Sequence, residues 1–160
     1  MQTNQQPPIL TADELLNNWQ GHRGLTRRVI EAFPEKELFE FSIGGMRSFA
    51  DLTKELLAIA VPGLKEIVTG KTHPLIEENN TLKTKADLLN AWDEATGHIN
   101  VYWKQITPEG FRKVFKLFGQ YEGPAINSIF YAIDNEIHHR GQGYVYLRAL
   151  GIEPPYFWKH

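Results

Sequence analysis

The sequence predicts an all-α protein, an antiparallel four-helix bundle. Four segments carry apolar residues at helical spacing, and each begins or ends at residues that cap or stop helices. Strand-like alternation is short and rare by comparison. Because four amphipathic helices bury their apolar faces most simply against one another, a bundle is the expected architecture.

The chain length favours a single domain over residues 1–160. A chain of 160 residues can bury roughly two thirds of the surface that its unfolded form exposes. Residues 1–9 are polar and contain prolines, and we expect them to be flexible or loosely packed. No run of about 18 apolar residues suggests a membrane span, so the protein is expected to have no membrane partner.

Composition restricts the function classes. The formal net charge is −2 and Lys and Arg are interspersed with acids, which argues against nucleic acid as a partner. The chain has no cysteine, so disulfides and thiolate metal sites are excluded. Nothing suggests an oxidising compartment, and we expect a cytoplasmic protein in which any metal ligand is His, Asp, Glu or Asn.

The first helix is predicted to begin after Thr11 and to end at Pro34. Thr11 and Glu14 have the spacing of a capping box, which satisfies free backbone N–H groups at a helix start. The segment after Pro34 alternates apolar and polar residues at 39–43, which favours a short extended stretch before the turn at Gly44 and Gly45. The tryptophans on the predicted apolar stripes are expected in the core: Trp19, Trp92 and Trp103.

The second and third helices are also marked by caps. Ser48 with Asp51 begins the second, in which Pro62, followed by glycine, is expected to cause a kink or break because proline lacks a backbone N–H. Residues 69–80 are polar and read as a loop. Thr84 with Asp87 begins the third helix, which closes at residues 107–108.

The pattern at residues 111–120 leaves two alternatives open, a short helix or an extended segment. The last and longest helix follows, from residues 123–124 to Gly151. It carries apolar residues on one side and polar residues on the other, so we expect both sides to be covered and the protein to be a homodimer. Gly141 and Gly143 inside this helix suggest close approach of another helix.

The most informative stretch is residues 134–142, where ionisable and amide side chains crowd an otherwise apolar helix. Side chains four residues apart share a helix face, so Asn135 with His139, or Asp134 with His138, can hold one metal ion between them. A hydrogen-bonded polar seam or a subunit contact explains the same pattern. The spacing alone does not decide between these readings.

The same region resembles a known family. Residues 138–142 (HHRGQ), followed by 146–148 (YLR) and 151–155 (GIEPP), look like the closing helix of the DinB/YfiT-like family. Trp19 with Arg27, and residues 47–49 (RSF), are similar to that family at the same relative places. The resemblance implies an antiparallel four-helix bundle, usually dimeric, with one divalent metal held by three histidines.

Carried onto this chain, the resemblance implies a ligand set of Glu55, Asn135 and His139. Only His139 keeps the family residue, and Glu55 and Asn135 stand where the family has histidines. His138 and His22 are reserve ligands that would restore a set of two histidines and one carboxylate. Such sets bind zinc, nickel, manganese or iron.

Two functions remain open. The resemblance implies a metal-dependent transferase or hydrolase that uses a low-molecular-weight thiol and a small-molecule substrate, since a bound cation lowers the pKa of a thiol or water ligand. The alternative is a non-enzymatic bundle that has lost the metal and serves as a binding or structural dimer. The replacement of two histidines supports this alternative.

Overall fold

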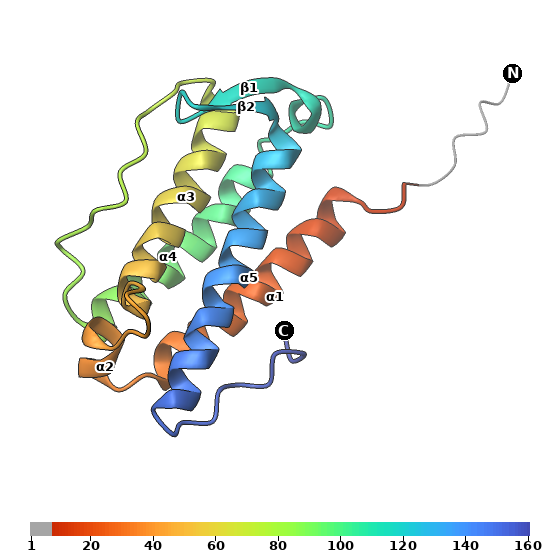
Figure 1. The fold of residues 1–160 in the computed structure, drawn as a ribbon. Coiled ribbons are helices and arrows are strands. Elements are labelled where there is room, and N and C mark those ends of the chain that lie inside the picture. The colour runs from red at the N-terminus through yellow and green to blue at the C-terminus, as the bar shows by residue number, and fades with distance from the viewer. Residues whose placement is uncertain (1–7) are drawn as a thin grey trace, which may run out of the picture.

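The computed structural model describes residues 8–160 and contains, within them, five α-helices and one two-stranded sheet (Figure 1). The elements are α1 (Ala12–Ala32), α2 (Glu35–Glu40), α3 (Phe49–Thr69), α4 (Lys85–Trp103), the 3-10 helix η1 (Gly110–Arg112), β1 (Val114–Leu117), β2 (Tyr121–Pro124) and α5 (Ala125–Ala149). The expectation of a mostly helical protein is confirmed. Of the segment 1–9 expected to be loosely packed, 1–7 lie outside the described residues, and residues 8 and 9 are exposed.

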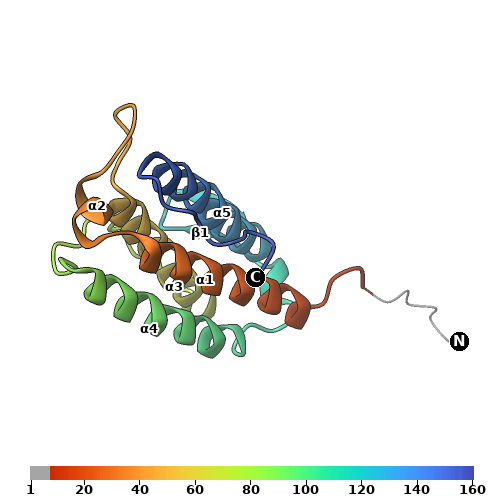
Figure 2. The same cartoon turned by 90° about the horizontal axis from the view of Figure 1, so that it is seen from below.

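The four long helices lie side by side, and α3 and α1 each contact both α4 and α5 (Figure 2). Two apolar clusters fill the space between them. One gathers around Trp19, Ile59, Trp103 and Ile129, and the other gathers around Val29, Phe49, Leu88, Trp92 and Tyr146. The three tryptophans expected in the core are all buried. No helix within residues 8–160 is long and apolar enough to cross a membrane.

The predicted helix starts are confirmed at three places. Thr11 and Thr84 each cap a helix through complete capping boxes with Glu14 and Asp87. The Ser48 hydroxyl accepts the N–H of Asp51 at 3.2 Å at the start of α3. Each contact satisfies backbone N–H groups that have no partner within the helix.

The proline in the second predicted helix does not interrupt it. Helix α3 runs from Phe49 to Thr69 with Pro62 inside, so of the two outcomes expected at residues 62–63, a kink or a break, the break is wrong. The residues around Pro62 are buried in the core, among them Ile59, Gly63 and Leu64. We attribute the intact helix to this tertiary packing, which offsets the hydrogen bond that proline cannot make.

The expected extended stretch at residues 39–43 is wrong for residues 39–40, which belong to the helix α2 (Glu35–Glu40), whereas Phe41 directly after the helix has extended backbone. Pro34 has the φ of −61° that proline imposes and precedes the first helical residue. The side chain of Leu38 is fully buried. Burial of this leucine therefore outweighs the weak alternation pattern, whereas the turn at Gly44 and Gly45 has the positive φ angles expected of it.

The segment left open at 111–120 becomes a 3-10 turn followed by a β-hairpin. Strands β1 and β2 pair antiparallel with Leu117 opposite Tyr121. The hairpin is fastened to α3 by Glu66, whose buried carboxylate accepts the N–H of Phe118 at 2.8 Å. The same carboxylate accepts the N–H of His73 at 2.5 Å. Glu66 therefore connects α3 both to the hairpin and to the loop that follows α3.

Close approach explains one of the two glycines in α5. A Cβ added at Gly143 would lie 2.5 Å from the ring of Phe49, whereas a Cβ at Gly141 would meet nothing within 4 Å. Phe49 is fully buried and stacked on Phe33 at 4.9 Å. The ring at the start of α3 therefore leaves no room for a side chain at Gly143.

Replacing these two glycines with alanine should have opposite effects. Gly143→Ala should lower the free energy of unfolding by about 1–3 kcal/mol, because the core must shift to admit a methyl group. Gly141→Ala is the control and should raise it by about 0.5–1 kcal/mol through helix propensity alone. Urea unfolding followed by circular dichroism measures both, and equal shifts in the two variants would contradict the close packing.

Candidate functional site

The structure brings the three residues proposed as ligands together between α3 and α5. Glu55 lies on α3, and Asn135 and His139 lie one turn apart on α5. His139 Nε2 and Asn135 Nδ2 each lie 3.1 Å from Oε1 of Glu55. The side chains of Glu55 and His139 are largely buried. The sequence therefore predicted a real cluster, although its chemistry depends on what else contacts it.

Arg47, which precedes α3, completes the group. Its guanidinium donates to Oε2 of Glu55 and lies 3.8 Å from the carboxylate of Glu77. Arg47 therefore pairs with two carboxylates, one on α3 and one in the loop after it. Arg47, Glu55, Asn135 and His139 are called the polar quartet below.

The quartet stabilises the ionised form of Glu55. Burial raises the pKa of this carboxyl group, but hydrogen bonds from Arg47, Asn135 and His139 favour the charged form and lower the pKa below its usual value overall. A carboxylate can only accept hydrogen bonds. Nε2 of His139 therefore carries the hydrogen in its contact with Glu55.

As arranged, the quartet does not fit a resident metal ion. While Nε2 of His139 donates to Glu55 it has no lone pair for a metal, and Nδ1 lies 2.7 Å from Oε1 of Gln142. Both oxygens of Glu55 accept hydrogen bonds, and the cationic guanidinium of Arg47 already balances the charge of the carboxylate. Across residues 8–160 no group of three His, Cys, Asp or Glu side chains is placed to hold a metal. The ligand set remains a prediction.

The two reserve histidines lie elsewhere. His138 is exposed, with its ring 5.1 Å from that of His139. His22 lies on α1. Its Nδ1 accepts a hydrogen bond from Arg140 on α5 at 3.1 Å, and its ring stacks on that of His160 at 4.5 Å. The C-terminal segment returns to α1 to make this stack (Figure 1).

A second buried cluster was not predicted as a unit from sequence. Glu136, 1% exposed, accepts the hydroxyl of Thr26 at 2.6 Å and lies 3.5 Å from Nη1 of Arg23 and 4.0 Å from Nη1 of Arg140. Arg23 also covers the ring of Trp92, 3.3 Å from its centroid. The four-residue spacing of Glu136 and Arg140 was the available signal. This cluster joins α1 to α5.

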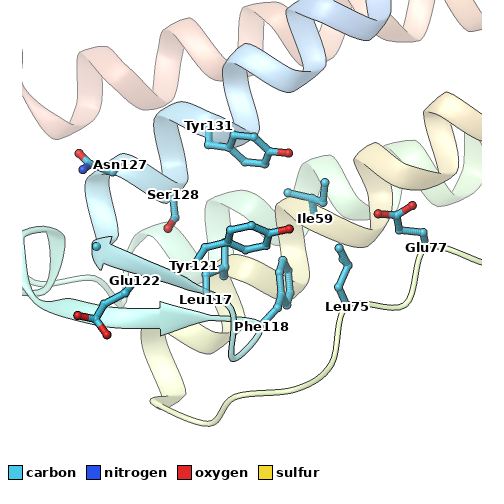
Figure 3. A pocket seen from close by; sticks show the side chains of 11 residues that line it. Ile59, Leu75, Glu77, Leu117, Phe118, Tyr121, Glu122, Asn127, Ser128 and Tyr131 are labelled. Carbon is cyan, nitrogen blue, oxygen red and sulfur yellow. The ribbon is translucent and has the colours of Figure 1, made fainter.

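A cavity of about 270 Å³ opens beside the polar quartet (Figure 3). Residues from α3, α5, the hairpin and the loop after α3 line it: Ile59, Leu75, Glu77, Leu117, Phe118, Tyr121, Glu122, Gly123, Asn127, Ser128 and Tyr131. Ile59 follows Glu55 by one helical turn and Tyr131 precedes Asn135 by one turn. Glu77 lines the cavity and lies 3.8 Å from Arg47, so this residue links the cavity to the quartet.

The cavity side of this site is electronegative. Burial raises the pKa of the Tyr131 phenol, and the negative charges of Glu55 and Glu77 and the nearby Tyr121 raise it further. No pattern in the sequence pointed to this cavity, because its walls come from four separate segments.

Both the sequence and the fold are similar to those of known proteins. The model of the DinB family matches residues 1–158, and a comparison with curated proteins gave no match. The fold is similar to a DinB-like protein from Bacillus subtilis, with 21% identity and a TM-score of 0.71 over 90% of this chain and 97% of that chain. The fold is also similar to a DinB-like protein from Bacillus cereus, with 15% identity and a TM-score of 0.73 over 90% of this chain and 95% of that chain.

A third similar structure is a mycothiol-dependent maleylpyruvate isomerase. It is 15% identical with a TM-score of 0.64, over 84% of this chain and 61% of that chain. This chain therefore spans about three fifths of the isomerase. At such identity the likeness shows a shared fold.

The environment of His22 predicts a pH effect on stability. Burial, Arg140 and His160 lower the pKa of His22 to about 4, whereas the unfolded chain has a value near 6.5. As pH falls from about 6.5 to 4, the imidazole of His22 therefore binds a proton in the unfolded state but not in the folded state. The free energy of unfolding decreases over this range. We expect a loss of about 1–2 kcal/mol, reduced by screening of this partly exposed ring.

Denaturant unfolding between pH 7 and 4 measures this effect. His22→Gln should lose less stability than the parent over that range. The exposed His98→Gln variant on α4 is the control and should follow the parent. Parallel curves for the parent and His22→Gln would contradict the assignment.

Proposed function

Because the chain belongs to the DinB family, which confirms the resemblance seen in the sequence, we propose that it binds a small molecule in the cavity between α3 and α5. The polar quartet beside the cavity then works without a resident metal ion. The observation that carries this proposal is the contact of Glu77 with both the cavity and Arg47. Small-molecule sites are typically apolar cavities with a few polar groups, which matches this arrangement.

The hydrogen bonding of the quartet supports a metal-free site. Glu55 is satisfied by Arg47, Asn135 and His139, so loading a cation would require these contacts to be given up. A buried carboxylate with such partners is stable as an ion and needs no metal for charge balance. The group is therefore suited to orienting a polar part of the bound molecule.

A metal-dependent, thiol-using transferase or hydrolase is the second candidate. It is favoured by the similarity of fold to a mycothiol-dependent isomerase and by the 3.1 Å separation of a carboxylate oxygen and an imidazole nitrogen. In this candidate Glu55, Asn135 and His139 hold zinc, nickel, manganese or iron, and a small thiol is a co-substrate. A bound ion would supply an activated thiol or water near neutral pH.

Metal content separates the two candidates. We expect protein purified without an affinity tag to contain well below one equivalent of transition metal and to resist loading with zinc, nickel and manganese. Glu55→Ala and His139→Ala should lower the free energy of unfolding by about 1–3 kcal/mol, because each leaves buried partners unsatisfied. Elemental analysis and thermal unfolding measure these quantities.

The opposite result would favour the enzyme. One equivalent of metal that disappears in both variants would overturn the metal-free proposal and justify screening thiol-transfer reactions. Glu78→Ala in the exposed loop after α3 is the control and should change neither the metal content nor the stability by more than about 0.5 kcal/mol.

We further propose that the protein is a cytoplasmic homodimer that associates through α5. Large apolar side chains remain exposed along this helix, with Phe130 at 41%, Ile137 at 39% and Val145 at 55%. A row of this kind is typical of surfaces that another helix covers. Two copies of α5 related by a two-fold axis would bury it.

Charge introduced on this face should prevent association. The double variant Ile137→Asp, Val145→Asp should be monomeric at micromolar concentration, because two carboxylates from each copy would be brought together away from water. Val101→Asp on α4 changes a similarly exposed valine, 54% accessible, and is expected to stay dimeric. Light scattering coupled to size exclusion measures the mass, and a parent protein that is itself monomeric would contradict the dimer.

A further inference from the structure

We propose that the cavity between α3 and α5 binds a small organic cation, a protonated amine or quaternary ammonium group carried on an apolar body. This inference rests on the proposed function, since it names the class of ligand for that cavity. It is argued from the chemistry of the walls. The volume of about 270 Å³ is at the lower end for ligand sites, so the ligand is small.

Aromatic rings and apolar side chains make most of the cavity. Tyr121 and Tyr131 approach from the hairpin and from α5 with both hydroxyls directed toward Ile59 and Glu77, and the ring of Phe118 lies below them (Figure 3). The faces of aromatic rings attract cations through their quadrupole. Three such rings around one space favour a positively charged group over a neutral one.

The charged groups have the matching sign. Among residues 8–160 no Lys, Arg or His side chain lines the cavity, whereas Glu77 does. Glu122 also contributes to the wall, but its side chain points away and lies opposite Lys116 in the hairpin (Figure 3). The carboxylate that faces the ligand is therefore that of Glu77.

Glu77 is available to a ligand. Its contact with Arg47 is 3.8 Å long and both side chains are about half exposed, while Arg47 is held more closely by Glu55. A loose, solvated ion pair of this kind contributes little to stability. A ligand cation can therefore replace Arg47 as the partner of Glu77 while Arg47 keeps Glu55.

An anionic ligand has few partners in the same space. Besides the phenols, the donors available are Ser128 and Asn127, and neither carries a charge. Burial is the main cause of the raised pKa of Tyr131, and the negative charges of Glu55 and Glu77 add to it because these carboxylates place a negative potential at the ring. The potential opposes a carboxylate or phosphate and favours a cation.

The ring of Phe118 is held in place by a conformation that aromatic residues rarely adopt. Phe118 has a φ of +52°, in the left-handed region where bulky side chains are uncommon. The buried carboxylate of Glu66 accepts its N–H at 2.8 Å. Together these contacts direct the ring toward the cavity, where it is 5% exposed, so this wall is preformed.

The test uses three ligands that share a phenyl ring and differ in charge: benzyltrimethylammonium, benzyl alcohol and benzoate. Titrations of the full-length protein are followed by amide chemical shifts of Phe118, Gly123 and Ser128, which report on the cavity. We expect benzyltrimethylammonium to bind at least fivefold more tightly than benzyl alcohol and benzoate to shift nothing.

Two variants test whether the preference for a cation depends on the carboxylate of Glu77. Glu77→Gln should weaken benzyltrimethylammonium about fivefold and leave benzyl alcohol unchanged, because only the attraction between charges is removed. Glu78→Gln, the neighbouring residue that does not line the cavity, should leave both unchanged. Thermal unfolding of each variant shows that the fold is retained.

The outcomes distinguish this inference from the proposed function. Equal binding of the cation and the alcohol, or cation binding that Glu77→Gln does not alter, would overturn the assignment of a cation while small-molecule binding in the cavity stands. Preferential binding of benzoate would overturn it in the same way. If no ligand of any charge shifts the cavity amides at millimolar concentration, both the inference and the binding proposal fail.

Discussion

The cost of burying a carboxylate underlies the arrangement of this protein. Within the described residues three glutamates are buried, Glu55, Glu66 and Glu136, and an ionised carboxylate away from water is stable only with hydrogen-bonding partners. In every case partners come from a different element. Glu136 joins α5 to α1, Glu55 joins α3 to α5, and Glu66 joins α3 to the hairpin and the following loop.

The same constraint decides the chemistry of the candidate site. The two oxygens of Glu55 that a metal would use are those that accept hydrogen bonds from Arg47, Asn135 and His139. Metal binding and the present packing of α3 against α5 therefore compete for the same atoms. Asn135 stands where the family resemblance implies a histidine. The amide N–H of Asn135 donates to the carboxylate of Glu55, whereas an amide oxygen is a weak metal ligand.

Glu66, the buried glutamate at the hairpin end of α3, positions two of the segments that line the cavity. Glu66 holds the N–H groups of His73 and Phe118, which fixes the loop and the hairpin at one end of the groove between α3 and α5. Side chains from both segments then complete walls that the two helices begin. The cavity and the polar quartet share α3, α5 and the contact between Arg47 and Glu77, so the charges of the cavity and of the quartet are coupled.

The sequence by itself determined the elements whose signals are local. Capping residues such as Thr11 and Thr84 act on backbone groups a few residues away, and apolar spacing identified the tryptophans of the core. The likeness of residues 47–49 and 138–155 to a known family also placed Glu55, Asn135 and His139 at one site. Tertiary structure decided what depends on partners distant in the chain. Core packing carried α3 through Pro62, burial of Leu38 made a helix of residues 35–40, and four segments enclosed the cavity. The partners of Glu55 and Glu136 could not be read from spacing, because hydrogen bonds across helices depend on how whole helices pack.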